Sequence, residues 1–76
     1  MIKKRLDYET AIDSDRIANE PTDEEIQKLI DIAKENPDCI VRVYWYVKYN
    51  GWFDRAFSID DTVESFKERL PKMYGL

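Results

Sequence analysis

The sequence predicts a small α+β fold, a two-layer sandwich in which two helices cover one face of a β-hairpin. The sheet has three strands if an N-terminal strand joins the hairpin. Three observations favour this fold class: a run of β-branched and aromatic residues over 40–59, the spacing of an amphipathic helix over 22–35, and a second helical pattern after the hairpin. The chain of 76 residues allows a single domain with one modest core.

The N-terminal segment, residues 2–8, alternates apolar and charged side chains as a short strand does, with Leu6 and Tyr8 on one side. If this strand pairs, the order is β-α-β-β-α, and a right-handed crossover places it parallel to the first hairpin strand. If it does not pair, the order is α-β-β-α. Residues 9–20 have no clean period, and we expect a turn or a short helix there.

The first helix is predicted over residues 22–35. Thr22 with Glu25 forms a capping box, and Asn36-Pro37 ends the helix. The apolar stripe of this helix contains Ile26, Leu29, Ile30 and Ala33.

The hairpin turns at Asn50-Gly51, and two registers are open. A two-residue loop would pair Tyr49 with Trp52 and would split the apolar residues between both faces. A three-residue loop that adds Tyr49, with Gly51 left-handed, pairs Lys48 with Trp52 and collects the apolar residues on one face. We therefore predict the three-residue loop.

This register gives the hairpin two unlike faces. The core face carries Val41, Val43, Trp45, Val47, Phe53, Arg55, Phe57 and Ile59, and the stem of Arg55 lies along its apolar neighbours. The opposite face carries Arg42, Tyr44, Tyr46, Lys48, Trp52, Asp54, Ala56 and Ser58.

The second helix is expected to begin with Asp60 or Asp61 as its cap and to end before Pro71. Its apolar face packs with the first helix onto the hairpin. The predicted core contains Ile26, Leu29, Ile30, Val41, Val43, Trp45, Phe57, Ile59, Val63, Phe66 and Leu70.

One segment resembles a known family. Val47 to Leu70, a bulged turn followed by a strand and the helical start Asp61-Thr62-Val63-Glu64-Ser65-Phe66-Lys67, is similar to the opening hairpin and helix of the β-grasp, or ubiquitin-like, fold. The resemblance covers about a third of the chain, and the later strands of that family have no counterpart after Leu70. The ending Tyr74-Gly75-Leu76 lacks a Gly-Gly tail, so conjugation is not implied.

Catalytic, metal and cofactor chemistry is mostly excluded by composition. The chain has no His and a single cysteine, Cys39, so it lacks a His-based nucleophile pair and a zinc ligand set. A phosphate-cradling loop needs several closely spaced glycines, and the chain has only Gly51 and Gly75. Asp13-Ser14-Asp15 begins like a calcium loop, but the pattern fails at Ile17 and Ala18. We predict no catalytic, cofactor-binding or metal residue and no enzymatic activity.

The charge is uneven along the chain. The formal net charge is −4, and residues 7–38 hold 11 acids against 3 bases, a net charge of −8. The lone Cys39 favours a reducing compartment, residues 3–5 are basic but precede no apolar signal region, and no stretch reaches transmembrane length. We expect a cytoplasmic protein without membrane contact.

Two surfaces are candidates for binding, one acidic and one aromatic. The acidic one could steer a basic partner, although acids at a helix start are also found on ordinary solvated surfaces. The aromatic one could bind a protein, or it could stack unpaired bases between flanking cations. The candidate residues are Asp23, Glu24 and Glu25 at the start of the first helix, and Arg42, Tyr44, Tyr46, Lys48 and Trp52 on the hairpin.

The aromatic rings could instead be covered by residues 9–20, by the C-terminal tail, or by a second copy packed sheet to sheet in a homodimer. An acidic protein meets repulsion when it approaches a polyanion, so nucleic acid is the weaker alternative. The sequence therefore predicts a non-enzymatic protein-binding module, such as a small inhibitor or accessory factor. The alternative is a single-stranded nucleic-acid binder.

Overall fold

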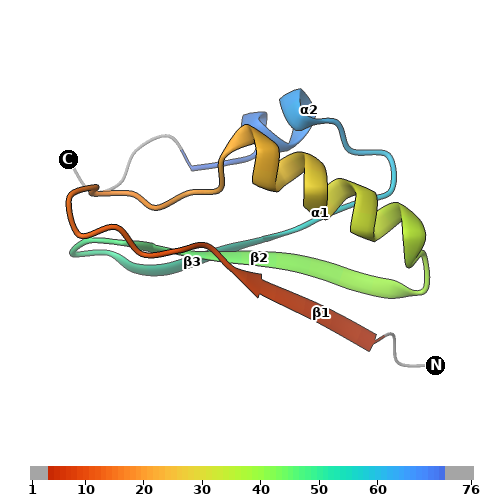
Figure 1. Cartoon of the computed structure of the whole chain (residues 1–76), viewed down its shortest axis with the longest axis horizontal. Helices are drawn as coiled ribbons and strands as arrows, with labels where there is room; N and C mark the ends of the chain where they lie inside the picture. Colours follow the sequence, from red (N-terminus) through yellow and green to blue (C-terminus); the bar gives the residue numbers. More distant parts are fainter. Residues whose placement is uncertain (1–3, 72–76) are drawn as a thin grey trace.

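The computed structural model describes residues 4–71. The elements follow the order β1 (Lys4–Glu9), α1 (Asp23–Glu35), β2 (Cys39–Val47), β3 (Gly51–Ala56) and α2 (Val63–Glu68). β2 is the central strand of a mixed sheet, parallel to β1 and antiparallel to β3. Both helices lie on one side of this sheet, and no described helix lies on the other (Figure 1). The predicted two-layer α+β fold is confirmed, and of the two open alternatives the sheet takes the one in which an N-terminal strand joins the hairpin.

The N-terminal strand extends one residue beyond the predicted residues 2–8 at its C-terminal end. β1 begins at Lys4 and ends at Glu9, and it pairs Leu6 with Val41. Residues 2 and 3 lie outside the described part of the chain. The side chains of Leu6 and Tyr8 are half-buried against the core, as the alternation predicts.

The segment from Thr10 to Asn19 forms no helix, so the helical alternative for residues 9–20 is wrong. The segment continues along the edge of β2 beyond the end of β1. The Thr10 amide donates to the Tyr44 carbonyl at 3.0 Å, and the Asn19 amide donates to the Tyr46 carbonyl at 3.0 Å. An isolated bridge also pairs Ala18 with Val47. These bonds satisfy polar groups of β2 that would otherwise lie at an edge, which a short helix could not do.

The first helix forms where the capping box predicts it. The Thr22 hydroxyl accepts from the Glu25 amide at 3.2 Å, and the Glu25 carboxylate accepts from the Thr22 amide at 2.9 Å. The helix ends at Glu35 with Asn36 as its C-cap. Its buried residues are the predicted Ile26, Leu29, Ile30 and Ala33.

The hairpin register differs from the predicted one by two residues. Tyr46 lies opposite Trp52 and Val47 lies opposite Gly51, whereas we expected Lys48 opposite Trp52. Because side chains alternate with a period of two, an even shift leaves the residues of β2 and β3 on their predicted faces. The division into a core face and an aromatic face is therefore confirmed, although the pairing is wrong.

The turn contains Lys48, Tyr49 and Asn50, and the Asn50 amide donates to the Val47 carbonyl at 3.1 Å. Gly51 has the predicted positive φ, 88°. Tyr49 also has a positive φ, 67°. The prediction reserved the left-handed conformation for glycine, and this second left-handed residue is what moved the register.

The core lies between the sheet and the helices. Trp45 is fully buried and stacks on Phe53 at a centroid distance of 6.2 Å. Ile59, which we placed in the core, is 51% exposed because β3 ends at Ala56 and its alternation does not continue. The buried apolar residues are Ile26, Leu29, Ile30, Ala33, Val41, Val43, Trp45, Val47, Phe57 and Phe66, and the predicted Val63 and Leu70 pack at the margin.

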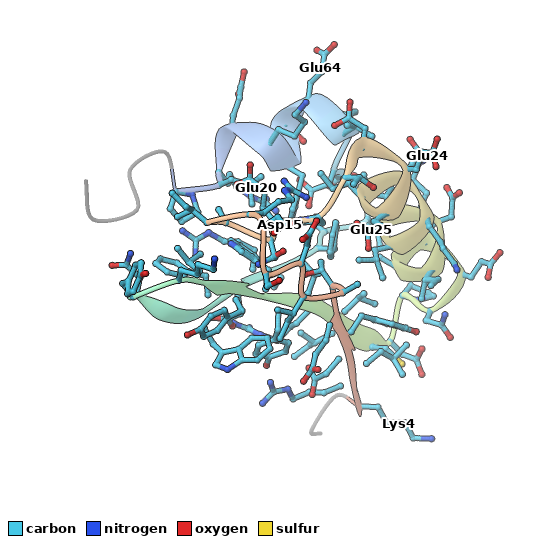
Figure 2. The ribbon with its side chains drawn as sticks, turned by 60° about the vertical axis from the view of Figure 1, so that its left-hand side comes forward. Lys4, Asp15, Glu20, Glu24, Glu25 and Glu64 are labelled. Atoms are coloured by element: carbon cyan, nitrogen blue, oxygen red, sulfur yellow. The ribbon has the colours of Figure 1, made fainter. Side chains whose placement is uncertain are left out.

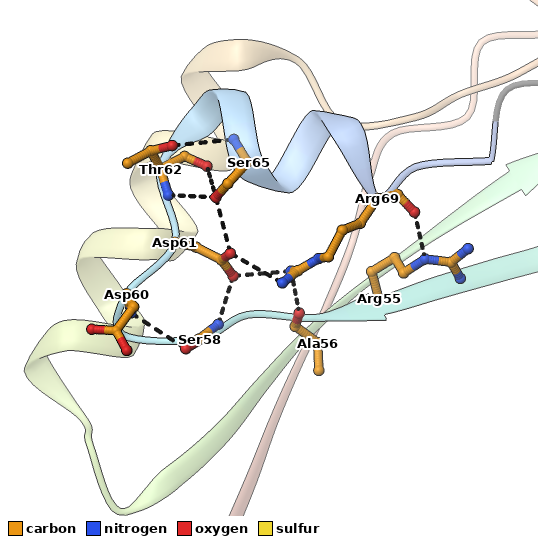
Figure 3. A network of polar contacts seen from close by, with 8 residues as sticks. All are labelled: Arg55, Ala56, Ser58, Asp60, Asp61, Thr62, Ser65 and Arg69. Atoms are coloured by element: carbon orange, nitrogen blue, oxygen red, sulfur yellow. Dashed lines mark hydrogen bonds and ion pairs between the residues drawn. The ribbon is translucent and has the colours of Figure 1, made fainter.

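The cap of α2 is Thr62, paired with Ser65 in a capping box, so the prediction of Asp60 or Asp61 as the cap is wrong. Asp61 is buried and serves a different purpose (Figure 3). Its carboxylate accepts from the Ser58 amide at 2.7 Å and from two nitrogens of Arg69 at 2.9 and 3.0 Å. This network fixes the segment after β3 to the end of α2.

Candidate functional site

The side of the sheet away from the helices carries the aromatic face. Paired residues of neighbouring strands point to the same side, so the register defines its members. They are Arg5, Asp7 and Glu9 from β1, Arg42, Tyr44 and Tyr46 from β2, and Trp52, Asp54 and Ala56 from β3. Four of the predicted binding residues therefore lie together on one face, and Lys48 follows directly after β2.

Tyr46 and Trp52 form the centre of this face. The Phe57 amide donates to the Val41 carbonyl at 2.7 Å, so Val41 and Phe57 form a hydrogen-bonded pair. Hydrogen-bonded and non-hydrogen-bonded pairs alternate along an antiparallel ladder, which makes Tyr46 and Trp52 a non-hydrogen-bonded pair. Such pairs bring their side chains closest together. The two rings meet edge to face with their centroids 5.5 Å apart, and Trp52 is 51% exposed.

The cations of the aromatic face are bound by groups of the chain itself. Arg42 donates through Nε to the Asp54 carboxylate at 3.0 Å and forms an ion pair with it through Nη2. The hydrogen bond to Asp54 raises the pKa of Arg42. Arg5 donates to the Tyr44 hydroxyl at 2.6 Å and lies 3.4 Å from the Asp7 carboxylate.

Among residues 4–71, and with Lys48 included, the face carries three cations and three acids and has no net charge. The cations are Arg5, Arg42 and Lys48, and the acids are Asp7, Glu9 and Asp54.

A hollow of about 320 Å³ adjoins Tyr46 at the turn end of the aromatic face. Two contacts hold residues 12–14 beside it: the Lys48 ammonium donates to the Ser14 carbonyl, and the Asp13 amide donates to the Asn19 side chain at 2.8 Å. This segment therefore flanks the aromatic face and leaves Trp52 open. The hollow is lined by Ile12, Asp13, Ser14, Asn19, Tyr46, Lys48 and Tyr49.

Exposed apolar side chains gather around the same end of the molecule. Tyr49 is 95% exposed, Ile12 60% and Ile17 54%. Ile17 is tied to the turn because its carbonyl accepts from the Lys48 amide at 2.8 Å. We name Ile12, Ile17 and Tyr49 the turn patch. Sequence reasoning missed it, although two isoleucines in the mostly polar stretch 9–20 are a signal that could have found it.

The predicted acidic residues lie elsewhere, at the start of α1 in the helical layer. Figure 2 shows Glu24 and Glu64 on the outer side of this layer, whereas Lys4 lies at the far end of β1. Glu25 serves the capping box, and Asp23 forms an ion pair with Lys67 at 2.9 Å. The sheet separates these acids from the aromatic face, so the two predicted surfaces do not form one site.

Within residues 4–71, no group of three or more Cys, Asp or Glu side chains is arranged to hold a metal ion. In the same part of the chain, no helix is long and apolar enough to cross a bilayer.

No family model, curated protein or solved structure matches this chain. The resemblance of Val47–Leu70 to the β-grasp fold stays an expectation from the sequence, and it assigns no functional residue. We therefore infer a function from the geometry of the surfaces.

Proposed function

We propose that this protein is a non-enzymatic protein-binding module that docks a protein partner on the aromatic face. The observation that carries the proposal is the pairing of the cations on that face, above all Arg42 with Asp54. A face whose described residues include the exposed Trp52 and two half-buried tyrosines, and carry no net charge, suits a protein surface better than a polyanion. The small size of the protein, 76 residues, fits an inhibitor or accessory factor.

The Tyr46–Trp52 pair is the natural anchor of the interface. Tyr, Trp and Arg are the residue types most enriched where binding energy concentrates, and the aromatic face contains all three. The hollow beside Tyr46 is at the lower limit of size for small-molecule pockets, and it suits one apolar side chain of the partner. The turn patch extends the apolar surface beyond the sheet, as contact areas of proteins often do.

Single-stranded nucleic acid is the alternative, since exposed rings beside cations can stack bases. The geometry favours it less. Arg42 is held by Asp54, Lys48 is held by the Ser14 carbonyl, and the whole chain has a net charge of −4. A phosphate would have to displace these contacts against the field of the protein. The acids of the helical layer would instead speed association with a basic protein.

The test compares two residues that are equally exposed. Trp52 on the aromatic face and Ile59 outside the core are both 51% exposed. Immobilised wild type, Trp52→Ala and Ile59→Ala are incubated with extract of the cognate cell, and captured proteins are identified and titrated by calorimetry. We expect a protein that binds wild type and Ile59→Ala but is lost with Trp52→Ala. Equal binding to all three would exclude the aromatic face as the docking surface.

A further inference from the structure

The two edges of the sheet differ in how their backbone groups are used. On β3, the Asp54 carbonyl accepts from the Arg55 guanidinium at 2.7 Å. The Ala56 carbonyl accepts from Arg69 at 3.0 Å (Figure 3). Two arginines thereby occupy carbonyls on this edge. Such side chains prevent another strand from adding there.

The edge of β1 is open. The hydrogen bond from Thr10 to the Tyr44 carbonyl fixes which residues of β1 bond to β2, and the alternation leaves the amides and carbonyls of Arg5, Asp7 and Glu9 pointing outward. Among residues 4–71, no segment pairs with this edge. An unpaired strand edge of this kind is a template for a further strand.

We propose that the further strand is β1 of a second copy, paired antiparallel about a two-fold axis at Leu6. In this register Arg5 lies opposite Asp7 of the second copy, and Asp7 lies opposite its Arg5. Both residues direct their backbone groups outward, so each of these two pairs exchanges two backbone hydrogen bonds. Leu6 meets its own copy on the helical side, where it is half-buried in the single chain.

Charge selects this register over its neighbours. Side chains stay on their own faces only if the register shifts by two residues. One such shift places Asp7 opposite Asp7, and its two Arg5–Glu9 pairs only match the number of opposite-charge pairs that the proposed register has without any like-charge pair. The other shift places Arg5 opposite Arg5. Like charges directly opposite one another destabilise a strand pair, whereas opposite charges stabilise it. The existing Arg5–Asp7 ion pair is exposed, with side chains 54% and 47% accessible, so exchanging it for the pair between copies costs little.

The dimer would have a continuous sheet with four helices on one side and two aromatic faces next to each other on the other. It does not depend on what the aromatic face binds. It would, however, present two docking surfaces in one plane, which raises the avidity for a partner with repeated sites.

The test uses charge reversal and charge exchange at the proposed interface. Sedimentation equilibrium compares wild type, Asp7→Arg, Arg5→Asp and the double variant Arg5→Asp/Asp7→Arg over a wide range of concentration. We expect each single variant to weaken dimerisation about tenfold or more, because it creates two like-charge pairs. We expect the double variant to recover dimerisation, because opposite charges again face each other. Circular dichroism confirms that each variant is folded.

Hydrogen exchange gives a second measurement on the unmodified chain. The amides of Arg5 and Asp7 should become protected as the concentration rises, while the amide of Asp54 on the β3 edge should not change. A wild type that stays monomeric throughout would overturn the proposal. So would a dimer that the single variants leave intact, or one that Trp52→Ala abolishes, since that dimer would form through the aromatic face.

Discussion

Tyr46 and Trp52 lie directly opposite each other across the hairpin, with their rings edge to face at a centroid distance of 5.5 Å. Each ring belongs to a strand whose other side is packed in the core, so the pair is held by a rigid support. The partners of Arg42 and Lys48 are found in the chain itself. The aromatic face is therefore ordered before any partner arrives, which reduces the entropy cost of binding.

The two tryptophans should differ widely in their effect on stability. Trp45→Ala should lower the free energy of unfolding by about 3–5 kcal/mol, because a fully buried indole leaves a cavity. Trp52→Ala should cost about 1 kcal/mol, the value of a partly exposed aromatic pair. Urea denaturation followed by circular dichroism measures both. Equal losses would show that the faces of the hairpin are assigned wrongly.

Two substitutions in the turn should change the free energy of unfolding in opposite directions. Tyr49→Gly should raise the free energy of unfolding by about 0.5–1 kcal/mol, because it relieves a left-handed residue whose exposed ring contributes little to packing. Gly51→Ala should lower it by about 1 kcal/mol. No atom lies within 4 Å of the position that the new methyl group would take, so this cost is conformational. Thermal melts test both, and a stabilising Gly51→Ala would contradict the turn geometry.

Alanine substitutions of the neighbours Asp60 and Asp61 should lower the free energy of unfolding by unequal amounts. Asp61→Ala should cost about 2–3 kcal/mol, because it removes the buried acceptor of Ser58 and leaves Arg69 without its carboxylate. Asp60→Ala is the matched control and should change stability by about 0.5 kcal/mol or less, since the side chain is exposed. Chemical denaturation of both variants measures the two free energies of unfolding. A similar cost for the two would mean that the network does not hold α2 to the sheet.

Nucleic acid should not bind at physiological salt. Fluorescence anisotropy with labelled single-stranded oligonucleotides is expected to show no change with wild type. Asp54→Asn removes the carboxylate that holds Arg42, so it would strengthen binding if Arg42 could reach a phosphate. Salt-sensitive binding by wild type that is lost in a folded Tyr46→Ala variant would replace the protein partner with nucleic acid.

The sequence was sufficient for features that depend on neighbours along the chain. The capping box at Thr22 and Glu25 and the stripe of α1 follow from helical periodicity, and the two faces of the hairpin follow from strand alternation. The division of residues such as Tyr46 and Trp45 between the faces was therefore predictable. The register was not, because it depended on Tyr49 taking a conformation that its residue type disfavours.

Tertiary structure alone decided how the surfaces are used. Residues 10–19 have no period because their backbone follows the edge of β2, and sequence patterns do not record hydrogen bonds between distant segments. The parallel pairing of β1 with β2 likewise joins distant segments, and it adds Arg5, Asp7 and Glu9 to the aromatic face, so that its described residues together with Lys48 carry no net charge. Local chemistry fixes which residues form an element and which side they face. Contacts between elements fix which charges remain free to meet a partner.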